Sequence, residues 1–395
     1  MSGKNPDPNR ASSPRVALLI ETSMAYGRDI LHGVAQYLRE NGPWTVFFEH
    51  RSLQDPAPPW LADWDGDGII TTLFPQFGHL IAGTGIPTID LDDQRPISGL
   101  PTVQSHQEAI GALAAEHLLE RGFTRFAFLG YPEFEWSRRR WLGFEGKVRA
   151  AGFACDEYLE TQPVTWGHQQ AAWETEIHAL AHWIARFPKP LGLMACNDYR
   201  GIQLLGACRH AGIAVPEEVA VIGVDNDILA CELAYPPLSS VVPDCRRIGY
   251  EAAAMLDRIM RKEPVHAEHP EVPPYGIVTR QSTDITAISD PLLAEAMHFI
   301  RRRACAGIQV EDVLEHVSTS RSVLQRRFRA GLGRSIHSAI TLVRLQRAKQ
   351  LLNETDLALP DIAERTGFSS VEYLSTWFRK STGTSPGVYR KKHKS

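Results

Sequence analysis

The chain has 395 residues, a length that predicts two or three domains. Its hydrophobic content of 43% and charged content of 22% are typical of a soluble globular protein, and no apolar run is long enough to span a bilayer. The formal net charge of −4 combines a basic tail of +8 from residue 285 onward (18 Lys/Arg, 10 Asp/Glu) with a preceding body of −12 (24 Lys/Arg, 36 Asp/Glu). Nucleic-acid binding through one module requires such a division, and chance variation of surface charge is the alternative.

The first 14 residues are polar, and the apolar run VALLI that follows them has only five residues. This run is too short for a secretory signal, so we expect a disordered N-terminus over residues 1–14, then a strand, and a cytoplasmic location. The six cysteines form no CxxC pair and no regular framework. We expect them to be small buried side chains, with three disulfides as the alternative.

Residues 15–283 alternate short apolar runs with amphipathic stretches. The expected strands are 15–20, 45–50, 67–71, 87–91, 125–130, 191–196 and 219–224. The expected helices are 27–42, 109–122, 141–152, 201–212 and 246–262, several of which end in Gly, a residue suited to a left-handed C-cap. This alternation predicts βαβ units and buried parallel sheets. Because the segment is large for one such sheet, we expect an α/β domain of two Rossmann-like lobes with a cleft between them.

Polar and aromatic side chains follow the expected strands, where open α/β sheets bind ligands. These candidate ligand residues are Tyr26, Trp136, Arg140, Asn197, Asp225 and Asn226. Carboxylate, amide and guanidinium groups hydrogen-bond to hydroxyl pairs, and an aromatic ring stacks on the C–H face of a sugar, so the set predicts a sugar site. Asn197 and Asp225 are equally suited to cap the helices that follow them. Arg138 and Arg139 are interpreted as solvated surface charges.

This body resembles the effector domain of the LacI/GalR regulators, which share their fold with periplasmic sugar-binding proteins. The matching segments are 67–70, 117–130, 140–144, 196–205 and 216–226. The resemblance implies that Arg140 hydrogen-bonds the sugar, with Asp225 as the acidic ligand and Asn197 as the amide ligand. His106-Gln107 stand where the family usually has Asp-Asn, which leaves a contact from that loop open. The DNA-binding head of that family precedes the body, where this chain has only polar residues, so we expect it elsewhere.

Other candidate sites fail on their spacing. Asp63-x-Asp65-x-Asp67-Gly68 begins like an EF-hand loop, but Phe74 stands where the bidentate Glu is needed. His178 and His182 have a spacing that zinc can use, without an HExxH motif or a third ligand. The chain has no P-loop and no GxSxG motif, so we expect no enzyme activity, no metal and no cofactor other than an effector sugar.

The tail begins after an expected linker at 282–290, where Asp290-Pro291 form an N-cap and a first helical position. The expected helices that follow are 310–317, 318–333, 335–356, 359–368 and 369–383. A short helix, a turn and a second helix occur twice, which predicts an all-α domain over 284–395 with two helix-turn-helix units. The helix between the units spans about 27 Å, so two reading helices could enter successive major grooves. A helical hairpin for protein contact is the alternative.

The segment IAERTGFSSVEYLSTWFRKSTGTSPGVYR is identified as the signature of the AraC family DNA-binding domain, with Leu374 where an aromatic is usual. The resemblance implies base contacts from one set of outward positions: Ser322, Gln325, Arg326, Glu372, Ser375 and Thr376. Phosphate contacts are expected from Arg327, Arg329, Arg379 and Lys380. Glu372 has a rival role, because Ser369-x-x-Glu372 fits a capping box.

A LacI/GalR-like body ahead of an AraC-type tail is similar to a family of transcriptional activators of D-xylose utilisation genes. The likeness is close over 282–314 and looser over 24–38, at Trp136 and over 196–226. It implies a homodimer that binds D-xylose, double-stranded DNA with direct-repeat half-sites, and RNA polymerase, away from any membrane. The alternatives are a regulator of the same class that responds to another sugar, a sugar receptor acting with a transporter and, more remotely, an enzyme.

Overall fold

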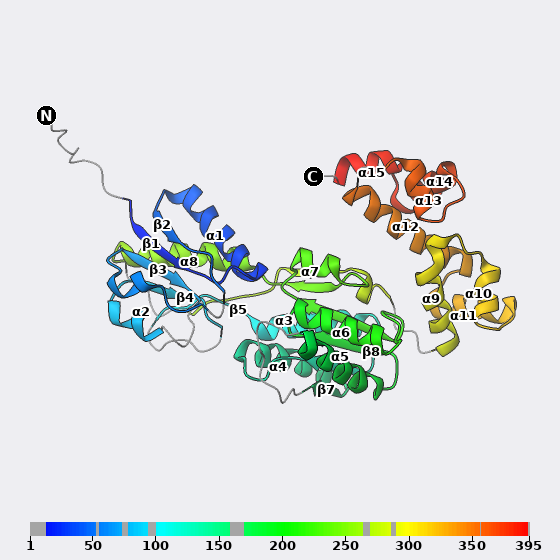
Figure 1. Cartoon of the computed structure of the whole chain (residues 1–395), viewed down its shortest axis with the longest axis horizontal. Coiled ribbons are helices and arrows are strands. Elements are labelled where there is room, and N and C mark those ends of the chain that lie inside the picture. The colour runs from blue at the N-terminus through cyan, green and yellow to red at the C-terminus, as the bar shows by residue number, and fades with distance from the viewer. Residues whose placement is uncertain are drawn as a thin grey trace. The chain divides into compact units, whose positions relative to one another are not determined.

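The computed structural model describes residues 13–52, 55–72, 78–93, 100–158, 170–263, 269–285, 290–355 and 357–393 (Figure 1). Most of the N-terminus that we expected to be disordered, and Phe74, lie outside these residues. The chain divides into two compact units. The first consists of residues up to 187, 191–212 and 220–284, and the second of 188–190, 213–219 and 285 onward. No helix of the described segments is both long and apolar enough to cross a membrane.

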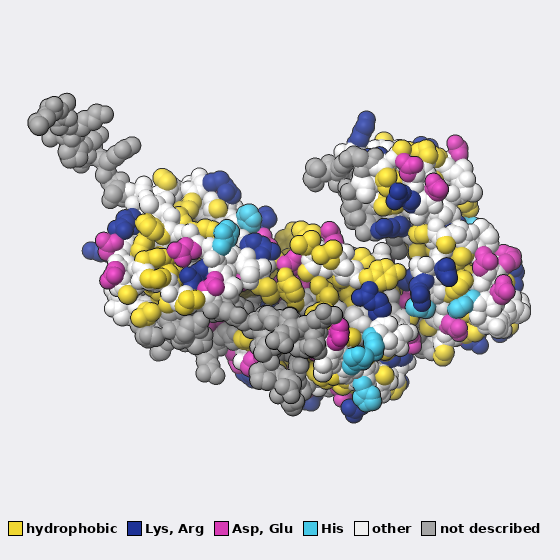
Figure 2. All heavy atoms as spheres, in the orientation of Figure 1, with side chains coloured by type: hydrophobic (Ala, Val, Ile, Leu, Met, Phe, Trp, Pro, Cys, Tyr) yellow, Lys and Arg dark blue, Asp and Glu magenta, His cyan; other side chains and the backbone are white. Residues whose placement is uncertain are grey.

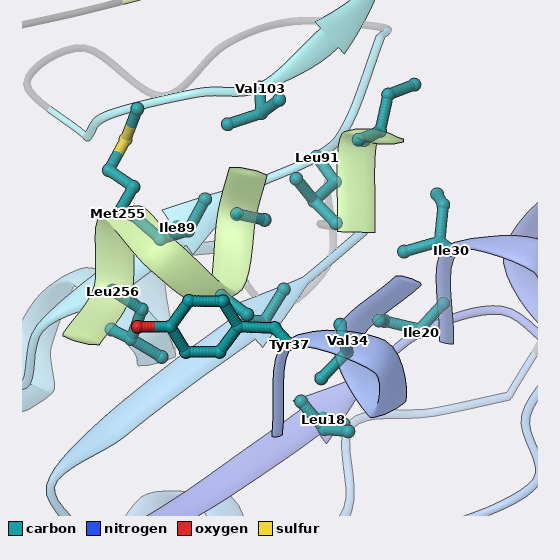
Figure 3. Close-up of a cluster of buried hydrophobic side chains, with 14 of the residues drawn as sticks. Leu18, Ile20, Ile30, Val34, Tyr37, Ile89, Leu91, Val103, Met255 and Leu256 are labelled. Carbon is teal, nitrogen blue, oxygen red and sulfur yellow. The ribbon is translucent and has the colours of Figure 1, made fainter. Parts of the chain in front are cut away.

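One parallel sheet of the first unit has the strand order β2-β1-β3-β4. Its strands are β1 (Arg15–Leu19), β2 (Thr45–Phe48), β3 (Gly68–Thr71) and β4 (Thr88–Asp90). Successive side chains point to opposite faces, and both faces of β1 are buried. Leu18 and Ile20 pack with Ile30 and Val34 of α1 (Ala25–Asn41) and with α8 (Cys245–Met260), as Figure 3 shows. The other face packs on α2 (Gly78–Thr84) and the short helix η1 (Pro59–Asp63).

The second sheet has the order β12-β10-β9-β8-β6-β7, with only the β12–β10 pair antiparallel among its described pairs. Its strands are β6 (Phe126–Leu129), β7 (Cys155–Tyr158), β8 (Leu191–Ala195), β9 (Val219–Val224), β10 (Ser239–Val242) and β12 (Gly276–Val278). Its helices are α3 (Gln107–Glu120), α4 (Glu135–Ala150), α5 (Gln170–Ala185), α6 (Asp198–His210) and α7 (Ile228–Leu233). β5 (Gln104–Ser105) pairs with β11 (Glu271–Val272). The expected α/β architecture with parallel sheets is thus confirmed.

Two expectations for this unit need correction. The strand expected at 45–50 was taken as buried, but β2 is the edge of its sheet and its side chains are exposed. The linker expected at 282–290 begins too early, because Ser282 and Thr283 are fully buried. Ser282 donates to Val221 O at 2.6 Å, and Thr283 accepts or donates at 2.7 Å with His117 of α3. The end of the body is therefore anchored in the second sheet and on α3.

The cysteines were expected to be small buried side chains, and most of them are. Cys196, Cys208, Cys231 and Cys245 are buried, whereas Cys155 and Cys305 are half-buried.

The second unit is helical over most of its length. Its helices are α9 (Pro291–Arg303), η3 (Ala304–Ala306), α10 (Val310–His316), α11 (Arg321–Leu332), α12 (Ile336–Glu354), α13 (Leu359–Arg365), α14 (Val371–Thr382) and α15 (Pro386–His393). One core joins α9, α10 and α11 to the first part of α12, and a second core joins the rest of α12 to α13 and α14. Asp290 caps α9 as expected. We did not anticipate α15, whose sequence carries charge and little apolar pattern.

Candidate sugar site and nucleic-acid interface

A chain of hydrogen bonds links strand ends of the two sheets in the first unit. The Tyr26 hydroxyl donates to Asp93 Oδ2 (3.2 Å) and also lies 2.8 Å from Ser105 Oγ. Gln107 Nε2 donates to the same Asp93 oxygen at 2.6 Å, and Arg140 Nε donates to Gln107 Oε1 at 2.7 Å. Tyr26 and Asp93 follow strands of the first sheet, whereas Arg140 follows a strand of the second. Polar groups suited to sugar hydroxyls therefore converge from both sheets.

Arg140 is the centre of this cluster and is only 3% exposed. Its Nη1 donates to Cys196 O at 2.5 Å, and its Nη2 donates to Asp225 Oδ1 at 3.3 Å. The ring of Trp136 lies beneath its guanidinium, with Cζ 4.9 Å from the ring centroid. The structure thus brings Asp225 together with Arg140 and Trp136, which sequence reasoning had selected from a different loop.

The two candidate caps resolve differently. Asn197 is the N-cap of α6, and its Oδ1 accepts from Arg200 N at 2.9 Å. Asp225 caps no described helix, because the N-cap of α7 is Asp227. Asp225 instead has a left-handed backbone (φ 100°) that turns its carboxylate toward Arg140. Asn226 also has positive φ, and its Oδ1 accepts from Arg280 at 2.8 Å, which ties it to a different partner.

Burial controls the ionisation of the carboxylates around Arg140. Burial raises the pKa of Asp93 to about 7, although hydrogen bonds from Gln107 and the charge of Arg140 oppose the rise. Burial also raises the pKa of Asp198 to about 8, with the nearby Asp225 charge acting in the same direction. The pKa of Asp225 is itself raised by burial and lowered by Arg140. With pKa values of about 7 and 8, Asp93 and Asp198 change protonation state near neutral pH.

In the second unit, some residues of the face of α11 that we predicted to read bases contact other parts of the chain. Ser322 and Arg326 are exposed, whereas Gln325 is half-buried and its Nε2 is shielded, with no hydrogen-bond partner among the described residues. Arg327 donates to both carboxylate oxygens of Asp290 at 2.6 Å, an ion pair with the N-cap of α9. Arg329 is exposed. Ser322 and Arg326 are thus the exposed candidate base readers on α11.

The face of α14 begins differently from the expected capping box. Its N-cap is Ser370, not Ser369, and the Ser370 hydroxyl accepts from Tyr373 N at 3.2 Å. Hydrogen bonds from the Glu372 backbone N–H and from Ser370 lower the pKa of Glu372. The Glu372 carboxylate therefore accepts hydrogen bonds in the first turn of α14, but not as part of the capping box that we expected with Ser369. The Thr376 hydroxyl donates to Glu372 O at 2.8 Å, and Ser375 is half-buried.

Cations border both reading helices. Arg379 and Lys380 are exposed in the last turns of α14, and Lys380 Nζ lies 4.9 Å from the centroid of the Trp377 ring. Figure 2 shows Lys and Arg side chains, in dark blue, on the exposed surface of the C-terminal helices. Backbone phosphates attract such a surface without regard to base sequence.

The candidate metal residues do not assemble a site. His178 lies on α5 as expected, but its ring contacts His210 at 4.2 Å between centroids. Among the described residues, no group of three or more His, Cys, Asp or Glu side chains is arranged to hold a metal ion.

Family models match a segment of each of the two units. A family model for a periplasmic binding protein-like domain matches residues 115–283, and one for a helix-turn-helix domain matches 313–392. The chain is 34% identical to the xylose operon regulatory protein of Escherichia coli strain K12, over 95% of this chain and 96% of that protein. For the same protein of Haemophilus influenzae strain Rd, the identity is 33% over 95% and 98%. The chain belongs to the family of xylose operon regulatory proteins.

Solved structures agree with this family. A structure described as the xylose-binding transcription activator xylR superposes with a TM-score of 0.83 at 32% identity, covering 98% of this chain and all of that chain. A periplasmic binding protein/LacI regulator from Alkaliphilus metalliredigens, solved with D-xylulofuranose, has a TM-score of 0.56 at 21% identity over 70% of this chain, which shows the fold alone. The family confirms the resemblance inferred from the sequence, a LacI/GalR-like body followed by an AraC-type tail.

Sequence reasoning missed two residues of the polar cluster. Asp93 lies just past the end of β4, where the rule for strand ends would have selected it. Gln107 was set aside because it departs from the family pattern, yet it joins Asp93 to Arg140. The roles of the named residues in binding sugar and DNA stay predictions.

Proposed function

We propose that the chain is a D-xylose-responsive transcriptional regulator that binds the sugar in its first unit and DNA through its C-terminal helices. The observation that carries this proposal is the likeness to xylose operon regulatory proteins over nearly the whole chain, which includes both modules in the same order. The effector is the sugar itself, with no metal or other cofactor.

The polar cluster around Arg140 supports a sugar as the ligand. A pentose presents adjacent hydroxyls that can donate to Asp93 and Asp225 and accept from Arg140 and Asn197. Trp136 and Tyr26 offer aromatic faces beside these groups. An apolar effector would leave the buried Asp93 Oδ1 without a partner among the described residues, which costs about 1–3 kcal/mol.

The C-terminal helices support recognition of double-stranded DNA. In this proposal α11 and α14 enter successive major grooves, and α12, with 19 residues, spans about 28 Å between the two helix-turn-helix motifs of the second unit. Arg326, Ser375 and Thr376 read bases, whereas Arg329, Arg379 and Lys380 hold phosphates.

The proposal extends to the assembly that regulates transcription. The chain acts in the cytoplasm as a homodimer on direct-repeat half-sites and activates RNA polymerase. Closure of the two lobes around D-xylose changes the arrangement of the dimer and hence the spacing of its two tails. The sugar can shift this equilibrium only by its differential affinity for the two states.

Titration calorimetry with D-xylose tests the sugar assignment. We expect wild-type chain to bind D-xylose at one site per chain, with binding weakened at least tenfold in Asp225→Asn, because a buried charge-assisted contact is lost. Glu145→Gln, on the far part of α4, is the control. Binding of another sugar but not D-xylose would overturn the ligand while leaving the class of protein.

Footprinting of the promoter upstream of the chain's own gene cluster tests the DNA assignment. We expect protection of two direct repeats that extends or strengthens with D-xylose. A chain that protects no DNA with or without sugar would overturn the regulator and favour a sugar receptor.

A further inference from the structure

Arg200 is the largest fully buried side chain in the described part of the chain, and the proposed function gives it no role. It lies on α6 one turn after Asn197 and is only 1% exposed. Burying a guanidinium costs several kcal/mol unless it is paired and hydrogen-bonded. The partners of Arg200 therefore indicate what the buried charge does.

A carboxylate on a neighbouring helix compensates the charge of Arg200. Its Nη1 forms an ion pair with Glu176 of α5, whose side chain is 13% exposed. The same Nη1 donates to Gln203 Oε1 at 2.7 Å, and Gln203 Nε2 donates to the other Glu176 oxygen at 2.7 Å. Glu176, Arg200 and Gln203 thus form a closed triad that holds the guanidinium plane between α5 and α6.

The guanidinium also contacts a set of aromatic rings. Its Cζ lies 4.7 Å from the centroid of the Tyr131 ring, which is buried just after β6. Tyr131 meets Phe134 and Trp136 edge-on at 5.7 and 6.1 Å, and these two rings stack at 5.7 Å. We call Tyr131, Phe134 and Trp136 the aromatic shelf. The far ring of the shelf, Trp136, packs against the guanidinium of Arg140.

Arg200 reaches the polar cluster by a second route. Its backbone N–H donates to Asn197 Oδ1 at 2.9 Å, which fixes the carboxamide expected to bind the sugar. One buried residue therefore contacts both the amide and the base of the shelf, without belonging to the cluster around Arg140.

We propose that Arg200, held in place by Glu176, is a positioning residue that orients the aromatic shelf for sugar binding. This inference rests on the proposed function. Without the Glu176 carboxylate, the guanidinium is no longer held in one plane, and its contact with the Tyr131 ring is loosened. The rings of the shelf then sample other orientations, and ordering them when the sugar binds reduces the free energy of binding.

Calorimetry of Glu176→Gln with D-xylose tests the inference. We expect the Kd for D-xylose to rise about 3- to 30-fold at unchanged stoichiometry, the range that cation–π contacts span from exposed to desolvated sites. Glu174→Gln, an exposed carboxylate two residues earlier on α5, should leave the Kd unchanged. A purely structural role would reduce the fraction of chains that bind, while the folded chains keep the wild-type Kd.

A mutant cycle separates positioning from general damage. In a Tyr131→Leu background, Glu176→Gln should raise the Kd no further, because the ring that Arg200 positions is gone. If Glu176→Gln fails to fold, the charge-free pair Arg200→Met with Glu176→Gln replaces it, with the same rise in Kd expected. An unchanged Kd in a folded variant, or full additivity with Tyr131→Leu, overturns the inference. Absence of D-xylose binding by wild-type chain overturns the proposed function and this inference with it.

Discussion

At the scale of single residues, the carboxylates near Arg140 decide how the proposed sugar site depends on pH. Asp93 accepts from Tyr26 and Gln107 through Oδ2, while its Oδ1 is buried with no partner among the described residues. A buried acceptor without a donor is costly, so a sugar hydroxyl there would satisfy it. A sugar hydroxyl donates to Asp93 Oδ1 when the carboxyl is ionised, and protonation of this oxygen would block the hydrogen bond. Burial raises the pKa of Asp93 to about 7.

We therefore expect the affinity for D-xylose to fall as the pH falls through 7. With Asp93 ionised at pH 8 and mostly protonated at pH 6, the Kd should rise about tenfold between these values. Calorimetry at pH 8, 7 and 6 measures this. The Asp93→Asn variant lacks the titrating carboxyl, so it should bind D-xylose weakly, and its Kd should change little with pH. A Kd that is flat between pH 6 and 8 in wild-type chain would exclude Asp93 as an acceptor for the sugar.

At the scale of elements, α3 and α4 form a close pair that sets the position of Arg140. A Cβ on Gly111 of α3 would lie 1.9 Å from Arg140 O, and one on Gly143 of α4 would lie 1.9 Å from Glu108 O. The backbones can approach this closely only because neither glycine has a side chain. The helices cannot move apart without displacing Arg140 and Gln107, which belong to the two helices.

Gly143→Ala should separate this pair. We expect a loss of about 1–3 kcal/mol in the free energy of unfolding, together with weaker D-xylose binding, because the clash is with backbone. Gly146→Ala on the same helix meets no atom within 4 Å and should be neutral or stabilise by about 0.5–1 kcal/mol. Urea unfolding of the two variants, with calorimetry, measures both effects. Equal stability of the two variants would contradict the close packing.

Near the C-terminal end of α3, the neutral side chain of His117 contacts Thr283, the last residue of the body. Burial lowers the pKa of His117 to about 3, and its Nε2 lies 2.7 Å from Thr283 Oγ1. Arg121 Nε donates to Thr283 O at 2.8 Å. The chain leaves the first unit two residues later.

The pKa of His117 gives this anchor a pH dependence of known sign. Its folded pKa is below the unfolded value of about 6.5, so its stabilisation is complete above pH 6.5 and is lost as the pH falls toward 3. Relative to neutral pH, wild-type chain should lose about 1.4 kcal/mol more than His117→Gln by pH 5.5. Urea unfolding at pH 7.5 and 5.5 measures the difference, and parallel losses in both chains would show that His117 is not buried neutral.

The reading helices permit a separation of base from phosphate contacts. Arg379→Ala should weaken binding to specific and nonspecific DNA alike and reduce the slope of log K against log salt by about 1. Arg326→Ala should cost about 1–3 kcal/mol on the operator and little on nonspecific DNA. Fluorescence anisotropy over a range of salt concentrations distinguishes the two. Identical effects of both variants on the two DNAs would contradict the assignment.

Much of each element could be predicted, and the misses have physical causes. The alternation of short apolar runs with amphipathic stretches located the long buried strands, because burial on both faces leaves a continuous apolar run. It missed the short strands β5, β7, β10, β11 and β12 and the short helices α2 and α7. It could not show that β2 is an edge, because exposure depends on strand order. The N-cap of α14 was misplaced by one residue because Ser369 and Ser370 are both good caps. A contact from Gln107 was left open because the residue departs from the family pattern, and its partners Asp93 and Arg140 are distant in sequence.

At the scale of the whole molecule, the division of charge matches the division of tasks. The acidic part of the chain contains the polar cluster, and the basic part contains the helix-turn-helix units. In the proposed regulator, sugar binding to the first part and DNA binding to the second must be energetically coupled. If D-xylose changes the affinity for DNA by some factor, DNA must change the affinity for D-xylose by the same factor.

Measurement of this reciprocal factor tests the account most directly. The Kd of wild-type chain for its footprinted operator is measured with and without saturating D-xylose, and the Kd for D-xylose with and without saturating operator. We predict that D-xylose tightens operator binding about 5- to 150-fold, with an equal factor in the reverse direction, and that L-arabinose at the same concentration has no effect. An operator Kd that D-xylose leaves unchanged would contradict a D-xylose-responsive regulator.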